Sequence, residues 1–329
     1  MLPRRMRVAI ALPTQAAGSG GGGIAYIHGL AAALRGLGVR VDLLEGDSPV
    51  FPPGVLPIID GMLLPTLAPR LDELVSRDAV ALMHRVSAQA GRDPAAREAV
   101  QAIERQMLPA LRRVIATSAP VAERLQHEFG VGAPHVVAPG AADLPRAAGS
   151  GEPGCRILSV GVLTPRKGHD RLLRALVRLM DLDWTLLIAG SAGRDPVHAA
   201  GLAALITELG LDRRATLLRD PEPDALEAAW RGADLFALAT CWEDYPAAVA
   251  EALRRGLPAV VTDAAGALPP PEAAAVCALD DAATLSKCLR RMVFDRALRE
   301  DMAKAAWTAG QALPGWPDRA REFDAILRS

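Results

Sequence analysis

Two carboxylates, Glu243 and Glu251, lie in the largely apolar segment CWEDYPAAVAEAL. Pro246 lies between them and suits the first turn of a helix, where its missing N–H costs no hydrogen bond. A helix that starts there puts Glu243 in the preceding loop and Glu251 in the second turn, on different faces. The N–H groups of Ala247 and Ala248 at that helix start attract a phosphate. A carboxylate can also accept hydrogen bonds from a diol. Such an arrangement could hold one extended ligand, with a polar group at Glu243, a phosphate at the amides and a diol at Glu251.

The spacing alone favours a simpler alternative, in which Glu243 caps the helix and Glu251 is a solvated surface residue. A second feature lies far away in the sequence, where the glycine-rich loop GSGGGG ends at Gly22 and Gly23. This loop is not a P-loop, because no G-K-[ST] follows it. It either forms a flexible surface loop or lets the backbone approach a ligand closely.

The length of the chain suggests two domains of ordinary size, although one large domain is possible. The chain has 329 residues, 50% hydrophobic, with a formal net charge of −1 and only 4% aromatic residues. This charge balance and the scarcity of aromatic residues argue against nucleic-acid binding. The four cysteines form no C-x-x-C pair and the six histidines show no H-x-x-x-H spacing. We therefore expect reduced, buried thiols in a cytoplasmic protein, with no structural metal.

The amino terminus, MLPRRMRVAIALPTQAAG, combines basic and small residues as a signal peptide does. Its apolar run is too short for such a peptide and fits a buried first strand better. No run approaches the ~18 apolar residues of a membrane span. The localisation that we expect is cytoplasmic, and attachment to the inner face of a membrane stays open.

Strands and helices alternate along the chain in two successive blocks. The first block runs from MRVAIAL to HVVAPG. The segment 139–154 is rich in Pro and Gly, which is typical of a linker between domains. The alternation then restarts at CRILSVGVL. This pattern predicts an α/β protein with two Rossmann-like domains, 1–146 and 147–312. The residues 313–329 are expected to form a helix that packs back on the first domain.

The segment WEDYPAAVAEALRRGLPAVVT resembles the E-x7-E segment of GT-B glycosyltransferases of family 4. The likeness extends to LSVGVLTPRKGHDRLLRAL, to LLIAGS, and to the N-terminal GGGGIAYIHGLAAALRGLG, ALMHRVSAQAG and VIATSAPVAERL. It covers almost the whole chain and is most specific in the second half. It implies a GT-B fold with two domains facing across a cleft. It also implies retaining transfer of a sugar from a nucleotide-diphosphate sugar to an acceptor hydroxyl.

The resemblance also implies residue roles. Lys167 would neutralise the departing diphosphate with help from Arg166, Glu243 would contact the donor sugar, and Glu251 would bind the ribose hydroxyls. His84 would face the sugar or the reaction centre. The remaining donor contacts would come from Gly22, Gly23, Tyr245, Pro246, Ala247 and Ala248. No tightly bound cofactor or metal is expected, and the acceptor is a carbohydrate, a lipid or a small molecule.

Two departures from the family pattern weaken the expected charge at the diphosphate. Val162 stands where the family often has an arginine, and Asp244 replaces the glycine that usually follows the first glutamate. They keep open a protein that binds a nucleotide-sugar with reduced or lost catalysis. A Rossmann dehydrogenase is a third class, suggested by GSGGGGIAY with Glu45 downstream. That class leaves the second domain and its E-x7-E segment unexplained. We expect acceptor specificity to lie in loops at 47–70 and 85–94.

Overall fold

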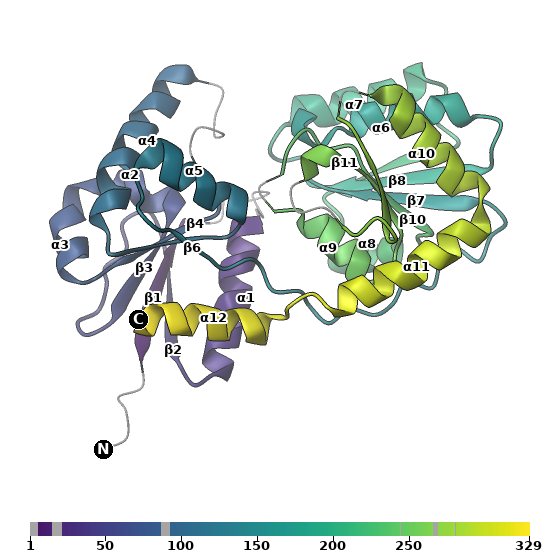
Figure 1. Cartoon of the computed structure of the whole chain (residues 1–329). Coiled ribbons are helices and arrows are strands. Elements are labelled where there is room, and N and C mark those ends of the chain that lie inside the picture. Colours follow the sequence, from purple (N-terminus) through teal and green to yellow (C-terminus); the bar gives the residue numbers. More distant parts are fainter. Residues whose placement is uncertain (1–5, 15–21, 87–92, 244, 266–268, 280) are drawn as a thin grey trace. The chain divides into compact units, whose positions relative to one another are not determined.

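The chain forms two compact units, each built on a parallel sheet. The computed structural model describes residues 6–14, 22–86, 93–243, 245–265, 269–279 and 281–329. One unit holds the described residues up to Gly140 together with Pro314–Ser329, and the other holds those of Ala141–Leu313 (Figure 1).

Within the described residues, the first unit has a six-stranded parallel sheet of order β2-β1-β3-β4-β5-β6. Its strands are β1 (Arg7–Leu12), β2 (Arg40–Glu45), β3 (Leu56–Asp60), β4 (Val80–Met83), β5 (Arg113–Ala116) and β6 (His135–Val136). The central β1 is buried over Val8–Leu12, as expected of a parallel strand covered on both faces. Alternate residues of β1 serve two cores, Ala9 and Ala11 on one face and Val8, Ile10 and Leu12 on the other.

Two sets of helices cover the faces of this first sheet. The helices α1 (Gly22–Gly36) and α12 (Trp316–Arg328) pack on each other and on the face of Ile10 (Figure 1). The opposite face is covered by α2 (Leu64–Leu67), α3 (Leu71–Ser76), α4 (Pro94–Met107) and α5 (Ala119–Phe129). The carboxyl-terminal helix thus belongs to the first unit, although the chain reaches it through the second.

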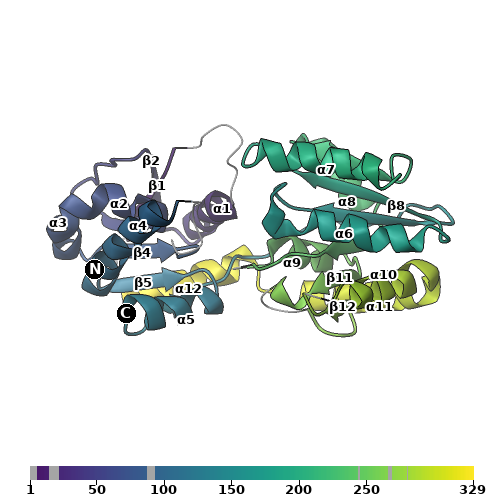
Figure 2. The same cartoon turned by 90° about the horizontal axis from the view of Figure 1, so that it is seen from above.

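The described part of the second unit also has a six-stranded parallel sheet, of order β12-β11-β10-β7-β8-β9. Its strands are β7 (Cys155–Val160), β8 (Trp184–Gly190), β9 (Ala215–Arg219), β10 (Leu235–Leu238), β11 (Ala259–Thr262) and β12 (Ala274–Cys277). The helices α6 (His169–Leu176), α7 (Pro196–Glu208) and α10 (Ala282–Phe294) cover one face of it. On the other face lie α8 (Pro223–Arg231) and α9 (Ala247–Arg254), below the strands in Figure 1 and behind them in the view from above in Figure 2. The long α11 (Arg296–Gln311) packs against α9.

The predicted alternation of strands and helices is confirmed, with three corrections. Residues 61–70, expected as a variable loop, form short helices, because Pro65 and Pro69 occupy first-turn positions where no N–H is needed. The strand β12, at Ala274–Cys277, was not predicted, since its short apolar run directly follows prolines. Helix α9 begins at Ala247 rather than at Pro246, which is its N-cap.

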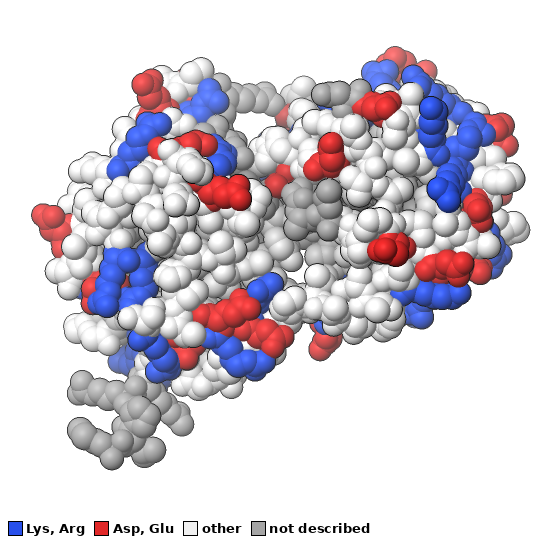
Figure 3. All heavy atoms as spheres, in the orientation of Figure 1, with Lys and Arg blue, Asp and Glu red and all other residues white. Residues whose placement is uncertain are grey.

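The surface carries charges of both signs. Acidic and basic side chains lie in small groups among the uncharged ones on the face drawn in Figure 3. Basic side chains gather over the part of the second unit that holds α10, where Lys287, Arg290 and Arg291 are exposed. Arg290 forms an ion pair with Asp181 at 2.7 Å, which offsets part of that charge. Among the described residues, no helix combines the length and the apolar character needed to cross a membrane.

The four cysteines are free thiols, as the lack of a C-x-x-C pair indicated. Cys155 and Cys277 are buried, whereas Cys241 and Cys288 are only half-buried. The expectation of four buried thiols was therefore wrong for two of them. Cys241 lies three residues beyond the end of β10, in the loop that leads to Glu243, which explains its partial exposure.

Candidate functional site

Two loops of the second unit meet at the carboxyl ends of adjacent strands. The loop after β7 contains Lys167, and the loop after β10 contains Glu243. Because β7 and β10 are parallel neighbours, both loops leave the same edge of the sheet. Gly168 allows their close contact. Its φ is +65°, and a Cβ there would lie 1.8 Å from the carbonyl oxygen of Ala239.

The carboxylate of Glu243 lies between two cations. One oxygen contacts the ammonium of Lys167, and the other accepts a 2.7 Å hydrogen bond from Arg166. Arg166 also donates to the carbonyl oxygen of Trp242 at 2.9 Å and lies over the Trp242 ring. Thr240 Oγ1 lies 3.2 Å from Glu243 Oε1. Two positive charges and one negative charge leave a net charge of +1 in this cluster.

Burial shapes the electrostatics of this cluster. The side chains of Glu243 and Lys167 are 7% and 11% exposed. Burial lowers the pKa of Lys167, and the neighbouring Glu243 carboxylate opposes that shift. An anion that approached this point would find the two cations already held in place by backbone and carboxylate contacts. Such preorganised charge interacts more strongly than charge in water.

Helix α9 starts next to this cluster. Pro246 is its N-cap, and no side chain within the described residues caps it through a hydrogen bond. The alternative that Glu243 caps the helix is therefore wrong, because Glu243 binds Arg166 and Lys167 instead. Tyr245 is half-buried before the helix, and Ala247 and Ala248 form its first turn.

Glu251 lies one turn further along α9 and is not simply solvated. Its side chain is 34% exposed and accepts hydrogen bonds from Arg255. Burial raises the pKa of Glu251, and the opposing effect of the Arg255 guanidinium cancels only part of this rise. The other alternative, of a freely solvated surface glutamate, is therefore wrong as well. Asp244 lies outside the described residues, as do residues 18–21 of the glycine-rich loop.

The first unit brings His84 and Gly23 together. His84 follows β4, and a Cβ on Gly23 would lie 2.9 Å from its Cδ2 atom. The neighbouring Gly22 is exposed and has no atom within 4 Å of such a Cβ. The packing of the imidazole against the start of α1 thus requires a residue without a side chain at Gly23 but not at Gly22. Tyr26 packs edge-on against His84 and donates a hydrogen bond to the carbonyl oxygen of Val137.

Asp60, at the end of β3, lies beside His84. Its Oδ2 atom is 3.6 Å from His84 Nε2, beyond hydrogen-bonding distance, while Oδ1 accepts a hydrogen bond from the Met62 N–H. Burial raises the pKa of Asp60 to about 6. Burial also lowers the pKa of His84 to about 4, so the imidazole is neutral at pH 7.

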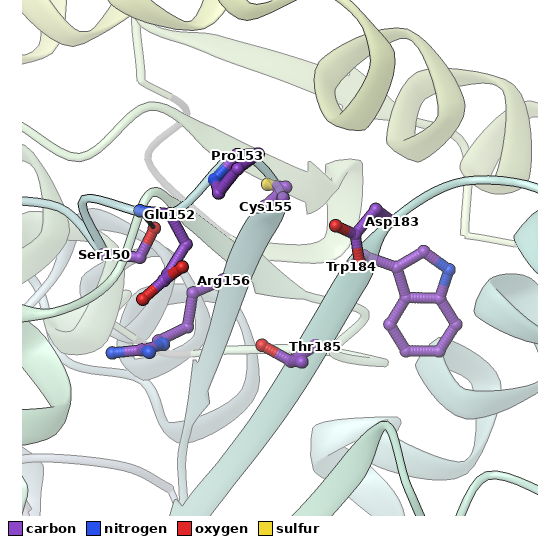
Figure 4. A pocket seen from close by; sticks show the side chains of 9 residues that line it. Ser150, Glu152, Pro153, Cys155, Arg156, Asp183, Trp184 and Thr185 are labelled. Carbon is purple, nitrogen blue, oxygen red and sulfur yellow. Dashed lines mark hydrogen bonds between the residues drawn. The ribbon is translucent and has the colours of Figure 1, made fainter.

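A hollow of about 220 Å3 lies at the other edge of the second sheet (Figure 4). Cys155 and Trp184, the first residues of β7 and β8, line it. Lys167 follows the carboxyl end of β7, so this hollow is at the opposite end of the sheet from the ion cluster. In parallel α/β sheets ligands bind at the carboxyl ends of the strands, so we do not assign the hollow to the candidate site.

Comparison with known proteins agrees with this placement. The model of the family described as "Glycosyl transferases group 1" matches residues 143–308, about half of the chain. The chain belongs to the group 1 glycosyltransferases. The match lies in the second unit and includes every element of the ion cluster and α9.

Curated relatives of this group 1 glycosyltransferase include D-inositol 3-phosphate glycosyltransferases. The one from Nocardia farcinica is 31% identical over 180 residues, which are 50% of this chain and 40% of that protein. The one from Mycolicibacterium smegmatis is 32% identical over 205 residues, covering 59% of this chain and 44% of the relative. The matched region thus spans less than half the length of these relatives.

Solved structures show the GT-B fold for this group 1 glycosyltransferase. Sucrose-phosphate synthase from Thermosynechococcus elongatus has a TM-score of 0.81 at 18% identity and covers 98% of both chains. Anabaena HepE in complex with UDP-glucose has a TM-score of 0.78 at 16% identity, covering 98% of this chain and 100% of that one. The predicted α/β fold with two Rossmann-like sheets is therefore confirmed.

Sequence reasoning missed several residues around the predicted ones. Asp60 could have been singled out, because it is an acidic residue at the carboxyl end of a buried, otherwise apolar strand. Arg255 could have been found as the i+4 partner of Glu251 on a helix. Thr240 and Glu227 carry no comparable signal, since only the folding of separate elements brings them to Glu243 and Arg255.

Proposed function

We propose that this group 1 glycosyltransferase is a retaining enzyme that transfers a hexose from a nucleoside-diphosphate sugar to an acceptor hydroxyl. The observation that carries the proposal is the ion cluster of Arg166, Lys167 and Glu243 at the start of α9. Glu251 follows one turn along the same helix. We propose that these groups contact, in order along the site, the sugar, the diphosphate and the ribose of the donor.

The donor is proposed to bind with its diphosphate at Arg166, Lys167 and the first turn of α9. The net positive charge of the cluster and the helix start both favour an anion there. Glu251 would accept hydrogen bonds from the ribose hydroxyls. Glu243 keeps lone pairs beyond those used by its cations, because a carboxylate offers about four acceptor positions. It can therefore hold a sugar hydroxyl while it also orients Lys167.

In the proposed reaction, the bond between the anomeric carbon and the diphosphate oxygen breaks, and negative charge grows on the diphosphate. Arg166 and Lys167 stabilise that charge, which lowers the barrier. The acceptor hydroxyl attacks the same face of the sugar, and its proton passes to the departing phosphate oxygen. This route retains the anomeric configuration without a carboxylate nucleophile, in contrast to a retaining glycosidase.

The first domain, residues 1–146, is proposed to bind the acceptor. The second domain, residues 147–312, is proposed to bind the donor. Residues 313–329 are proposed to return to the first domain. Packing of α12 on α1 supports the last assignment. His84, held against Gly23 and beside Asp60, is proposed to face the sugar or the reaction centre. The proposed acceptor is a hydroxyl group of a carbohydrate, a lipid or a small molecule.

A second candidate is a protein that binds the nucleotide-sugar without transferring it. It is favoured by one observation: Glu243 pairs with both Arg166 and Lys167, and Val162 adds no third cation. Under this candidate the cations would bind the diphosphate too weakly in the transition state to promote its departure.

Nucleotide release separates the two candidates. The chain is incubated with UDP-glucose, UDP-galactose, UDP-N-acetylglucosamine, GDP-mannose and ADP-glucose, with and without a panel of acceptors. We expect one donor to release its nucleoside diphosphate, and Glu251→Gln to weaken binding of that donor. Calorimetric binding without release would favour the second candidate. Absence of both binding and release for every donor would exclude both.

A further inference from the structure

Arg255 joins two carboxylates from two helices. It follows the last residue of α9, and its Nε and one Nη atom donate to Glu251 Oε1 at 3.2 and 3.0 Å. The other edge of the guanidinium forms two hydrogen bonds, of 2.9 and 2.6 Å, with the two oxygens of Glu227 on α8. The planar fork of arginine suits this geometry, and a lysine could not reproduce it.

The guanidinium is buried, whereas its two partners are not. The Arg255 side chain is 3% exposed, against 37% for Glu227 and 34% for Glu251. Its guanidinium lies over the ring of the buried Trp230, 5.4 Å from the ring centroid. Its carbonyl oxygen accepts a hydrogen bond from the Ala147 N–H. Arg255 is therefore held on several sides, so it can act as a fixed support.

The two carboxylates are held in different ways. Glu227 uses both of its oxygens on Arg255, but Glu251 uses only Oε1. Within the described residues, no hydrogen bond to Glu251 Oε2 is found, and the side chain keeps a third of its exposure. The arrangement thus fixes the Glu251 side chain through one oxygen and leaves the other available to a ligand.

We propose that Arg255, supported by Glu227, is a positioning residue that presets the Glu251 carboxylate for a nucleotide ribose. The inference rests on the proposed donor site and adds the device that orients its ribose contact. Arg255 does not touch the ribose itself. It restricts the rotamer of Glu251 before the ligand arrives, so less conformational freedom is lost on binding.

Arg255 also favours the ionised form of the Glu251 carboxylate, which is the better acceptor for ribose hydroxyls. Ribose hydroxyls donate most strongly to an ionised carboxylate. Burial favours the neutral form of Glu251, and the Arg255 charge favours the ionised form. Removing Arg255 therefore both frees the side chain and weakens it as an acceptor. The resulting loss of affinity should appear only with ligands that carry the ribose hydroxyls.

The test measures discrimination between ribose and dideoxyribose. Calorimetry on the full chain first ranks UDP, GDP and ADP, and the tightest of them is compared with its 2′,3′-dideoxy counterpart, which lacks both ribose hydroxyls. We expect the unmodified protein to prefer the ribonucleotide about tenfold, the effect of a hydrogen bond to a charged group. In Arg255→Met the ribonucleotide should bind about tenfold more weakly and the dideoxynucleotide nearly unchanged.

Three further variants sharpen the test. Glu227→Gln removes the support but keeps Arg255, so the preference should fall only about two- to threefold. Arg255→Lys keeps the charge without the fork, and should recover part of the preference that Arg255→Met loses. Arg296→Met is the matched control, because Arg296 pairs with Glu300 four residues on, in an exposed position of α11. It should leave the preference at its original value.

The outcomes distinguish this inference from the proposed function. If Arg255→Met weakens both nucleotides equally, or neither, Arg255 only joins α8 to α9 and the inference is wrong. If Arg255→Met does not fold, Arg255→Lys and Glu227→Gln decide in the same way. If none of the three ribonucleotides binds the unmodified protein, the proposed donor site itself is wrong, and the inference falls with it.

Discussion

The ammonium group of Lys167 contacts the carboxylate of Glu243, although 76 residues separate them in the sequence. The contact exists because β7 and β10 are parallel neighbours whose loops leave the same edge of the sheet. Arg166 completes the pair on the other carboxylate oxygen. The consequences of this contact, and of the packing in the first unit, can be measured.

Replacing Lys167 should remove transfer more than binding. In Lys167→Met the charge that stabilises the departing diphosphate is lost, so kcat for nucleotide release should fall roughly 10²- to 10³-fold. KM should change much less, because Arg166 and the start of α9 remain. Lys304→Met is the matched control, since Lys304 also pairs with a carboxylate but is 71% exposed. Equal losses in the two variants would contradict a catalytic assignment for Lys167.

The glycines at the start of α1 should respond differently to the same substitution. In Gly23→Ala the new methyl group would lie 2.9 Å from the His84 ring and must displace it. We expect slower transfer in this variant. Gly22→Ala meets no atom within 4 Å and should leave the rate unchanged. Steady-state kinetics of the two variants make the comparison, and similar rates would remove His84 from the proposed site.

Gly168 should be essential for stability, unlike a glycine elsewhere in the same unit. Gly168→Ala combines a φ of +65° with a contact of 1.8 Å to the backbone of Ala239. We expect a loss of about 3 kcal/mol or more in the free energy of unfolding. Gly201 lies exposed in α7 with open space around it, so Gly201→Ala should gain about 0.5 to 1 kcal/mol. Urea denaturation of both variants tests the difference.

Asp60 should reduce stability at neutral pH. Burial raises its pKa from 3.8 to about 6, so the folded state binds the proton more tightly than the unfolded state. Ionisation therefore costs stability, fully above pH 6 and not at all below about pH 4. Asp60→Asn keeps the acceptor for the Met62 N–H and removes this cost. It should gain about 2 to 3 kcal/mol at pH 7, and nothing at pH 3.5.

The titration of His84 should lower the stability of the folded state as the pH falls from 6.5 to 4, whereas that of Asp60 raises it. Burial lowers its pKa from 6.5 to about 4, so the folded state binds the proton less tightly than the unfolded state. The contribution of the neutral His84 to the stability of the folded state is complete above pH 6.5 and is lost as the pH falls to 4. His84→Gln should therefore show a shallower loss of stability on acidification than the unmodified protein. Parallel pH profiles of the two would contradict the burial of His84 that the structure shows.

Much of the fold follows from local sequence. Apolar runs such as Val8–Leu12, which ends at Pro13, indicate buried parallel strands. Their alternation with amphipathic helices leads to two Rossmann-like sheets. The E-x7-E spacing and the Lys-Gly pair at 167–168 pointed to a nucleotide-sugar site through family resemblance. Prolines were the main source of error, because Pro65 and Pro69 suit a helix start as well as a loop.

The sequence by itself determined which chemical groups are present and which strands precede them. Only the tertiary structure decided which groups touch. The ion cluster of Glu243 with Arg166 and Lys167, the support of Glu251 by Arg255 and Glu227, and the placing of Asp60 beside His84 all depend on strand order and helix packing. A local pattern holds no information on contacts between distant segments, because burial and sheet pairing across the whole unit set those distances.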